Sequence, residues 1–371
     1  MPVGDPCINS KVATEILGRP ALTGMGGSVH LEKAKLCAKG ARDEFAERFS
    51  RDTYELHEKC GLDFICCELV PGKNDRCIYK FETDDVWTVT DPETGMWWRY
   101  KYTALSDDAS EIACRITEEG EGAIERFLEF IRNETENFDT SILQNVQFCL
   151  DQCGDNRFIF ARPPYVYPAG MSWYTTFLEL MIAEPELAQE ICDTMLARTL
   201  KVIDALGRIG THGLFVHGDW AGNQGLLFSP SIIRTYLAPQ MRKMSEAGHK
   251  FGMYFVKHTD GNIMQIAEEF CTGMGFDGFQ SVDPGAGMSM KQMKALYGDK
   301  ILLMGNVDCG HILPYGTNEE IVDATIRCIQ EGARGGGFCL TSSNSISGDI
   351  TAKRFMTMVE AAKKYGQYPI I

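Results

Sequence analysis

The segment FVKHTDGNIMQIAEEF, residues 255–270, places a histidine and an aspartate between an apolar run and a helical pattern. The imidazole of His258 and the carboxylate of Asp260 are groups that transfer protons or bind metal ions. The segment can also be interpreted as a plain turn from strand to helix, because Asn262 and Gln265 follow a capping-box pattern. A helix cap needs no imidazole at the end of a strand, so we interpret the segment as a turn that carries a site.

Polar or ionisable side chains also follow most of the other apolar, strand-like runs. In chain order they are Glu68; Arg162 and Tyr165; His217, Asp219 and Trp220; Gln280 and Asp283; Asn306 and Asp308; and Ser342 to Ser345 around Asn344. Any one of them could cap a helix, because loops are polar in general. Together they predict a polar, partly acidic pocket with aromatic neighbours, which suits a small or flat organic ligand.

Short apolar runs alternate with longer segments of helical period from about residue 156 onward. The runs are RFIFA (157–161), GLFVH (213–217), GMYFV (252–256), DGFQS (277–281), ILLMG (301–305) and GGFCL (336–340). From residue 213 onward their starts are 39, 25, 24 and 35 residues apart, which leaves room for the crossover helices of parallel strands. The pattern predicts an α/β fold, a (β/α)8 TIM barrel with catalytic groups at the carboxyl ends of its strands. A doubly wound open sheet is the alternative, weakened because no G-x-G-x-x-G or Walker A loop follows a strand.

The first third of the chain adds further elements to this barrel. A helix is expected over residues 31–60, before GLDFICCEL (61–69), which is typical of an early barrel strand. Two alternating runs in VWTVTDPETGMWWRYKYTAL flank Asp-Pro-Glu-Thr-Gly, and this predicts a β-hairpin. We therefore expect one barrel domain over 1–371, with an amino-terminal helical extension (1–60) and a hairpin insertion (80–105) that covers part of one barrel mouth.

The composition excludes several classes of protein. A formal net charge of -15 with no basic stripe argues against a nucleic-acid partner. The 14 cysteines are scattered, without the paired spacing of a structural zinc site, and no secretory or membrane segment is recognisable. These features predict a cytoplasmic protein with no membrane partner, and the many oxidisable side chains favour an anaerobe. The absence of G-x-S-x-G and H-E-x-x-H excludes serine hydrolases and zincins.

The carboxyl-terminal half resembles the uroporphyrinogen decarboxylase superfamily in the order of its motifs: GDWAGNQGLLFSPSIIRTYLAPQ, FVKHTDGNI, GFDGFQSVDP, ILLMGNVDCGHILPYG and GGFCLTSSNSI. The resemblance covers most of residues 156–371 and implies a (β/α)8 barrel. Members are porphyrinogen decarboxylases or methyltransferases that serve corrinoid proteins. The decarboxylases bind their carboxylated substrate with an arginine-rich stretch ending in Gln-Ala-Gly-Arg, but the corresponding ILGRPALTGMGGSVHLEK holds only Arg19. A decarboxylase of a porphyrinogen-like or other carboxylated substrate is therefore the second choice.

The methyltransferase branch that feeds coenzyme M binds zinc through His-x-Cys-Gly and a cysteine in the last strand loop. Here the matching positions hold His258-Thr259-Asp260-Gly261 and Asn344, so both thiolates are missing. Zinc in that branch forms a thiolate from the acceptor, and the loss of two soft ligands argues against that reaction. The resemblance then implies the first methyltransferase of an O-demethylase, which moves a methyl group from a small, often aryl, methyl ether to Co(I). No Asp-x-His-x-x-Gly corrinoid signature is present, so the corrinoid is expected on a separate partner protein.

An ether oxygen leaves poorly unless a proton or a Lewis acid meets the charge that develops on it. We therefore expect His258, Asp260 and Asp219 to be catalytic. If a metal is bound, zinc is the candidate, with His258, Glu68 and His217 as the first ligand set and Asp219 or Asp260 as further candidates. A metal-free acid is the alternative.

The remaining strand-end residues are candidates for binding the methyl donor. Arg162 could hold a carboxylate such as that of a methoxybenzoate. The candidates for ring stacking are Trp220, Tyr254 and Trp98, and those for orienting polar substituents are Gln280, Asn306 and Asn344. A barrel that binds a small molecule without catalysis is a further alternative, although so many ionisable strand-end residues favour an enzyme. The sequence does not specify the oligomeric state, and a homodimer remains open.

Overall fold

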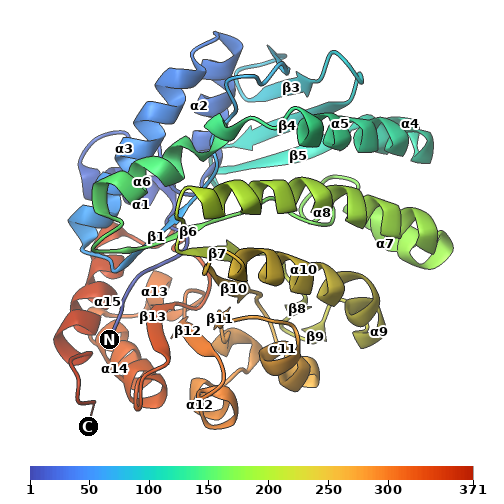
Figure 1. The fold of residues 1–371 in the computed structure, drawn as a ribbon. Helices are drawn as coiled ribbons and strands as arrows, with labels where there is room; N and C mark the ends of the chain where they lie inside the picture. The colour runs from blue at the N-terminus through green and yellow to red at the C-terminus, as the bar shows by residue number, and fades with distance from the viewer. Residues whose placement is uncertain (371) are drawn as a thin grey trace.

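A curled, seven-stranded parallel sheet forms the centre of the molecule in this computed structural model, which describes residues 1–370 (Figure 1). In sheet order the strands are β1 (Phe64–Cys67), β6 (Phe158–Ala161), β7 (Gly213–Val216), β10 (Tyr254–His258), β11 (Gly278–Gln280), β12 (Leu302–Val307) and β13 (Phe338–Ser342). Each of the seven predicted apolar runs overlaps one of these strands. The predicted barrel-type α/β fold is therefore confirmed.

The amino-terminal residues lie between the first and last strands of this sheet. Val3 forms a parallel bridge with Leu340 of β13, and the N–H of Gly4 donates to the carbonyl of Leu340 (3.1 Å). On the other side, the N–H of Asp63, just before β1, donates to the carbonyl of Val3 (2.9 Å). Residues 2–4 thus satisfy backbone groups on both edges and take the place of an eighth strand.

Helices cover the outside of the barrel (Figure 1). Those that follow the strands and those that precede β1 and β6 are α3 (Arg42–Cys60), α6 (Gln144–Cys153), α7 (Tyr174–Ala183), α8 (Pro185–Arg208), α9 (Pro230–Ile232), α10 (Ala238–His249), α11 (Ala267–Gly273), α12 (Met290–Tyr297), α13 (Ile312–Tyr315), α14 (Asn318–Gly332) and α15 (Ala352–Tyr365). Within residues 1–370, none of the helices has the length and apolar character needed to cross a bilayer.

Successive side chains along each strand point alternately into the barrel and toward the surrounding helices, because neighbouring residues of a strand face opposite sides. Inside the barrel, Phe160, Phe215, Val256 and Met304 belong to one small buried cluster, while the intervening residues pack against the helices. His258 follows Val256 at the same spacing, so its side chain continues the interior row to the barrel mouth.

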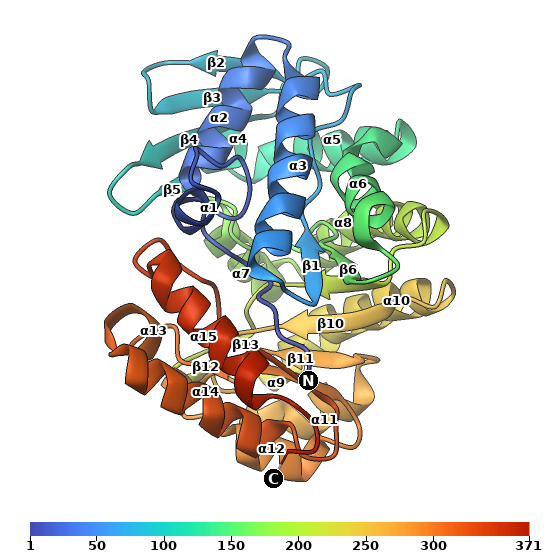
Figure 2. The ribbon, with the colours of Figure 1, turned by 90° about the vertical axis from the view of Figure 1, so that its left-hand side faces the viewer.

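The predicted amino-terminal extension and hairpin are both present, the second in a larger form. The extension consists of α1 (Ser10–Leu17), α2 (Gly27–Ala38) and α3. The hairpin is β3 (Val86–Thr90) with β4 (Trp97–Thr103), but β2 (Ile78–Phe81) and β5 (Asp108–Cys114) pair along its two sides. The insertion is therefore a four-stranded antiparallel sheet, not a lone hairpin, and it stands above the barrel beside α2, with helices α4 (Arg115–Glu119) and α5 (Ile124–Glu136) following it (Figure 2).

The turn after β10 is held by a glycine in the left-handed region. Gly261 has φ +80°, and a Cβ atom there would lie 2.4 Å from backbone atoms of Ala221 and Gly222. Those two residues form β8 (Ala221–Gly222), which pairs with β9 (Gly225–Leu226) in the loop after β7. The helix expected directly after the turn starts late, since a short 3-10 segment (Met264–Ile266) precedes α11.

This close approach predicts the effect of a methyl group at position 261. We expect Gly261→Ala to lower the free energy of unfolding by roughly 1–3 kcal/mol more than Gly210→Ala, because overpacking adds to the strain of a positive φ. Gly210 is the matched control, with φ +81° and nothing within 4 Å of its Cβ position. Chemical denaturation measures both losses, and equal losses would show that the turn does not press against β8.

Candidate functional site

A cavity of about 330 Å3 lies at the carboxyl ends of the barrel strands. Strand ends, the amino-terminal segment and the loop before α2 form its wall. The lining residues are Pro6, Cys7, Met25, Arg162, Tyr165, Ala169, Gly170, Phe215, His217, Gly218, Asp219, His258, Asp260, Asn344 and Ser345. The cavity therefore occupies the barrel face on which catalytic groups of such folds are found.

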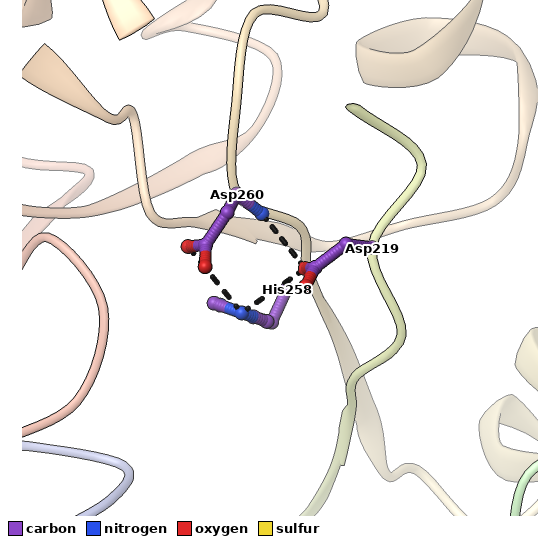
Figure 3. A group of neighbouring side chains, drawn as sticks. All are labelled: Asp219, His258 and Asp260. Carbon is purple, nitrogen blue, oxygen red and sulfur yellow. Dashed lines mark hydrogen bonds and ion pairs between the residues drawn. The ribbon is translucent and has the colours of Figure 1, made fainter. Parts of the chain in front are cut away.

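Three side chains in this cavity, Asp219, His258 and Asp260, point toward one another (Figure 3). The Nε2 atom of His258 lies 3.5 Å from Oδ1 of Asp219 and 3.6 Å from Oδ1 of Asp260. The backbone N–H of Asp260 donates to Oδ1 of Asp219 (2.9 Å), which connects the loop after β7 to the loop after β10. We call these three residues the acidic triad.

The hydrogen bonds of Gln280 determine which nitrogen of His258 carries the proton. The amide nitrogen of Gln280 donates to the carbonyl of Ser342 (3.1 Å) and to the hydroxyl of Thr341 (3.3 Å). The amide oxygen therefore faces Nδ1 of His258, with which it forms a hydrogen bond, so Nδ1 must be the donor. The lone pair of the neutral imidazole is then on Nε2, toward the two carboxylates.

Burial shifts the pKa values of His258 and Asp260 in opposite directions. It lowers the pKa of His258 to about 4, although the carboxylate of Asp219 acts in the other direction. Burial, with the charges of Asp219 and Asp283, raises the pKa of Asp260 to about 7. Near neutral pH the imidazole is therefore a neutral acceptor, and Asp260 is protonated in a substantial fraction of molecules.

The triad also fits a metal ion. One ligand atom from each of the three residues lies within 4.8 Å of the other two, and Oδ1 of Asp260 is buried without any hydrogen-bond partner among residues 1–370. Nitrogen and oxygen ligands at about 2.0–2.1 Å from a tetrahedral ion are roughly 3.3 Å apart, close to the two distances from Nε2. Three such ligands would leave a fourth position for substrate, as in catalytic zinc sites.

A buried lysine connects the loop after β7 to the end of β10. Lys257 is fully buried, and its ammonium group donates to the carbonyl of Gly218 (2.7 Å) and to that of His258. The ammonium also lies 5.2 Å from the ring centroid of Trp220. Burial lowers the pKa of Lys257 to about 7, against the effect of the carboxylates of Asp219 and Asp260. The lysine fixes where the loops after β7 and β10 begin.

The residues predicted as catalytic thus come together, whereas the first metal-ligand set does not. His217 lines the cavity, but its Nδ1 atom is bonded to the hydroxyl of Tyr165 (2.7 Å). Glu68 forms an ion pair with Arg162. Neither belongs to the group that surrounds Nε2 of His258, and the carboxylates of Asp219 and Asp260 stand there instead.

Of the predicted substrate-binding residues, Arg162 and Asn344 line the cavity and Gln280 supports it from behind. Asn344 donates through its side-chain amide to Oδ2 of Asp260. The amide of Asn306 is used inside the barrel wall, donating to the carbonyl of Val282 (2.8 Å) and accepting from the thiol of Cys328 (3.3 Å). Its predicted contact with substrate is therefore wrong.

The predicted ring-stacking residues all lie away from the cavity. Trp220 is fully buried against Phe270, Trp98 packs against Phe130, and Tyr254 is 58% exposed at the amino-terminal start of β10. These predictions are wrong because Trp220 packs against α11, Trp98 belongs to the inserted sheet, and Tyr254 begins the strand that His258 ends. The ring beside the site is instead Phe215, with its centroid 6.2 Å from that of His258.

Sequence reasoning missed several parts of the wall. Phe215 could have been found from the period of two, since it shares a strand face with His217. Lys257 has no sequence signal beyond its place in an apolar run. Pro6 and Cys7 reach the site only because the amino-terminal segment closes the barrel.

Removal of single ligands should distinguish the triad from the ligand set predicted first. We expect His258→Ala to weaken binding of Zn2+ or Co2+ by more than about 100-fold and Gln280→Leu by about 10–100-fold, because Gln280 only orients the imidazole. His217→Gln should leave the affinity unchanged. Competition with a chelator measures each dissociation constant, and equal losses in the His217 and His258 variants would contradict the triad.

Metal binding should release a proton from Asp260. A carboxylate must be ionised to bind a metal, and with a pKa of about 7 a larger fraction of Asp260 is protonated at pH 6 than at pH 8. The number of protons released per metal should therefore fall as the pH rises, and Asp260→Asn should abolish this dependence. Calorimetric titration in buffers of different ionisation enthalpy measures it. Equal release at pH 6 and pH 8 would show that Asp260 holds no proton.

Comparison with known proteins agrees with the fold. A curated uroporphyrinogen decarboxylase from Psychromonas ingrahamii is 22% identical over 195 residues, 51% of each protein, so the chain spans about half the length of that relative. A solved methyltransferase from Methanosarcina mazei, 18% identical, shares the fold with a TM-score of 0.59 over 96% of this chain and 98% of that one. The family model described as uroporphyrinogen decarboxylase (URO-D) matches residues 163–365, more than half of the chain, and the protein therefore belongs to the uroporphyrinogen decarboxylase family.

Proposed function

We propose that this protein is the methyltransferase of an O-demethylating system. It moves a methyl group from a small methyl ether, with an aryl ether as the first choice, to the Co(I) of a separate corrinoid protein. The family membership and the likeness over nearly the whole chain to a protein described as a methyltransferase support this proposal. The single observation that carries it is the acidic triad, in which the carboxylate of Asp260 stands at a position where the resemblance implies a thiolate.

The triad suits the departure of an ether oxygen. When Co(I) attacks the methyl carbon, the C–O bond breaks and both of its electrons go to the oxygen, which must then receive a proton or another positive partner. Asp260 lies in the cavity wall, and with a pKa of about 7 a substantial fraction of it is protonated at neutral pH, so it is the acid that we assign to the leaving oxygen. A zinc ion, when bound, would supply Lewis acidity to the same oxygen. The side-chain amide of Asn344, which donates to Asp260, and the carboxylate of Asp219, which accepts from the Asp260 backbone N–H, orient Asp260.

The same cavity is poorly suited to the alternative function, which is decarboxylation of a polycarboxylated tetrapyrrole. Such a substrate needs several cationic side chains to compensate its carboxylates. Within the described chain, Arg162 is the only arginine or lysine that lines the cavity, and Glu68 already neutralises it. The facing carboxylates of Asp219 and Asp260 would repel the substrate further.

A methyl-transfer assay tests the proposal. We expect the protein to form methylcobalt when it is mixed with a reduced corrinoid protein and one of a panel of methyl ethers. The absorption spectrum of the corrinoid measures this reaction. Asp260→Asn should slow the transfer by roughly 10²–10⁴-fold, the usual contribution of a positioned acid. Asp277→Asn is the matched control, since Asp277 is hydrogen-bonded to His249 (2.7 Å) at the opposite end of the barrel. Loss of CO2 from a porphyrinogen without any corrinoid, or no methylation with any ether, would contradict the proposal.

A further inference from the structure

Arg162 is the residue of the cavity that would recognise an anionic substituent, but most of its N–H groups already donate to other groups of the protein. Its guanidinium donates to the carboxylate of Glu68 and to the carbonyl of Pro6. The Nε–H group is directed at the sulfur of Cys66 (3.2 Å) and one Nη at that of Met25 (3.4 Å). The side chain is only 5% exposed, so little of the guanidinium remains for a ligand.

The other charges around the cavity are of the sign that repels an anion. Asp219 and Asp260 face the space directly. The second nearby cation, Lys257, lies behind the wall, where its ammonium is bonded to two backbone carbonyls. A divalent metal ion on the triad would be balanced by the two carboxylates that would hold it. A carboxylate on the methyl donor would therefore lose its hydration without gaining a free cation.

We propose that the methyl donor carries no carboxylate and that Glu68 determines this specificity by occupying Arg162. The inference rests on the proposed function for the identity of the reaction, but the charge preference is a property of the cavity and is measured by binding alone. A ring without charge can lie against Tyr165, which is half-buried in the same wall. In this arrangement Glu68 is a specificity-determining residue that touches Arg162 and not the reacting atoms.

Two ligands with the same ring and different charge test the inference. Guaiacol and vanillate share a methoxyphenol ring and differ by one carboxylate, and neither can react without a corrinoid protein. We expect the wild-type protein to bind guaiacol at least about ten-fold more tightly in calorimetric titration, the scale of one charge-assisted contact. Equal affinity, tighter binding of vanillate or no binding of either ring would overturn the inference.

The substitution Glu68→Gln should change the preference in a defined direction. It removes the competing carboxylate, so the affinity for vanillate should rise roughly ten-fold or more while that for guaiacol changes little. Glu58→Gln is the control, because Glu58 forms a similar ion pair with Arg157, which precedes β6 at the other end of the barrel. An unchanged ratio in a folded Glu68→Gln protein would overturn the role of Glu68. If that variant does not fold, the wild-type ratio still decides the charge preference.

The failure of the proposed function can be distinguished from the failure of this inference. If guaiacol binds preferentially but no methyl group reaches any corrinoid protein, the charge preference holds and the methyltransferase proposal fails. If methyl transfer occurs and vanillate is the better donor and ligand, the methyltransferase proposal holds and the inference fails.

Discussion

Three hydrogen-bond acceptors face one another at the barrel mouth, and they require a cation between them. The Nε2 lone pair of His258 lies 3.5 Å from the carboxylate of Asp219 and 3.6 Å from that of Asp260, and Oδ1 of Asp260 has no donor in the described structure. Such a cluster is stable only when a proton or a metal ion offsets the repulsion. Either one is also what a departing ether oxygen needs. Burial, together with the charges of Asp219 and Asp283, raises the pKa of Asp260, so the same surroundings that favour a cation here favour the proposed chemistry.

The parallel barrel is what brings the acceptors together. His258 and Gln280 are register partners on β10 and β11, so the imidazole and the amide that orients it are neighbours by strand pairing alone. Gln280 is held in turn by backbone and side-chain groups of β13, and Lys257 connects the loops that carry Asp219 and His258. The site is therefore supported on rigid strands, with the glycine turn at Gly261 placing Asp260 beside them.

The barrel was predictable from sequence because its signals are repeated: apolar runs with helical segments between them can form few architectures. His258 and Asp260 were predictable for a similar reason, since their place at a strand end follows from the local pattern. The positions of Trp220 and Tyr254 were not predictable for different reasons. Trp220 lies in the loop after β7, where no strand period applies, and Tyr254 shares a strand face with His258 but lies at the other end of β10. The ion pair between Arg162 and Glu68 could not be predicted from local sequence patterns either. The two residues are 94 positions apart and meet only in the folded barrel.

In the proposed reaction, a metal ion held by imidazole and carboxylate ligands activates an oxygen leaving group, whereas thiolate ligands serve a thiol acceptor. X-ray absorption at the zinc edge of the zinc-loaded protein distinguishes these two ligand sets. We expect a first shell of nitrogen and oxygen atoms at about 2.0–2.1 Å, with the outer-shell scattering of one imidazole and no sulfur. A sulfur shell at about 2.3 Å would show that a cysteine binds the metal and would contradict the proposed site.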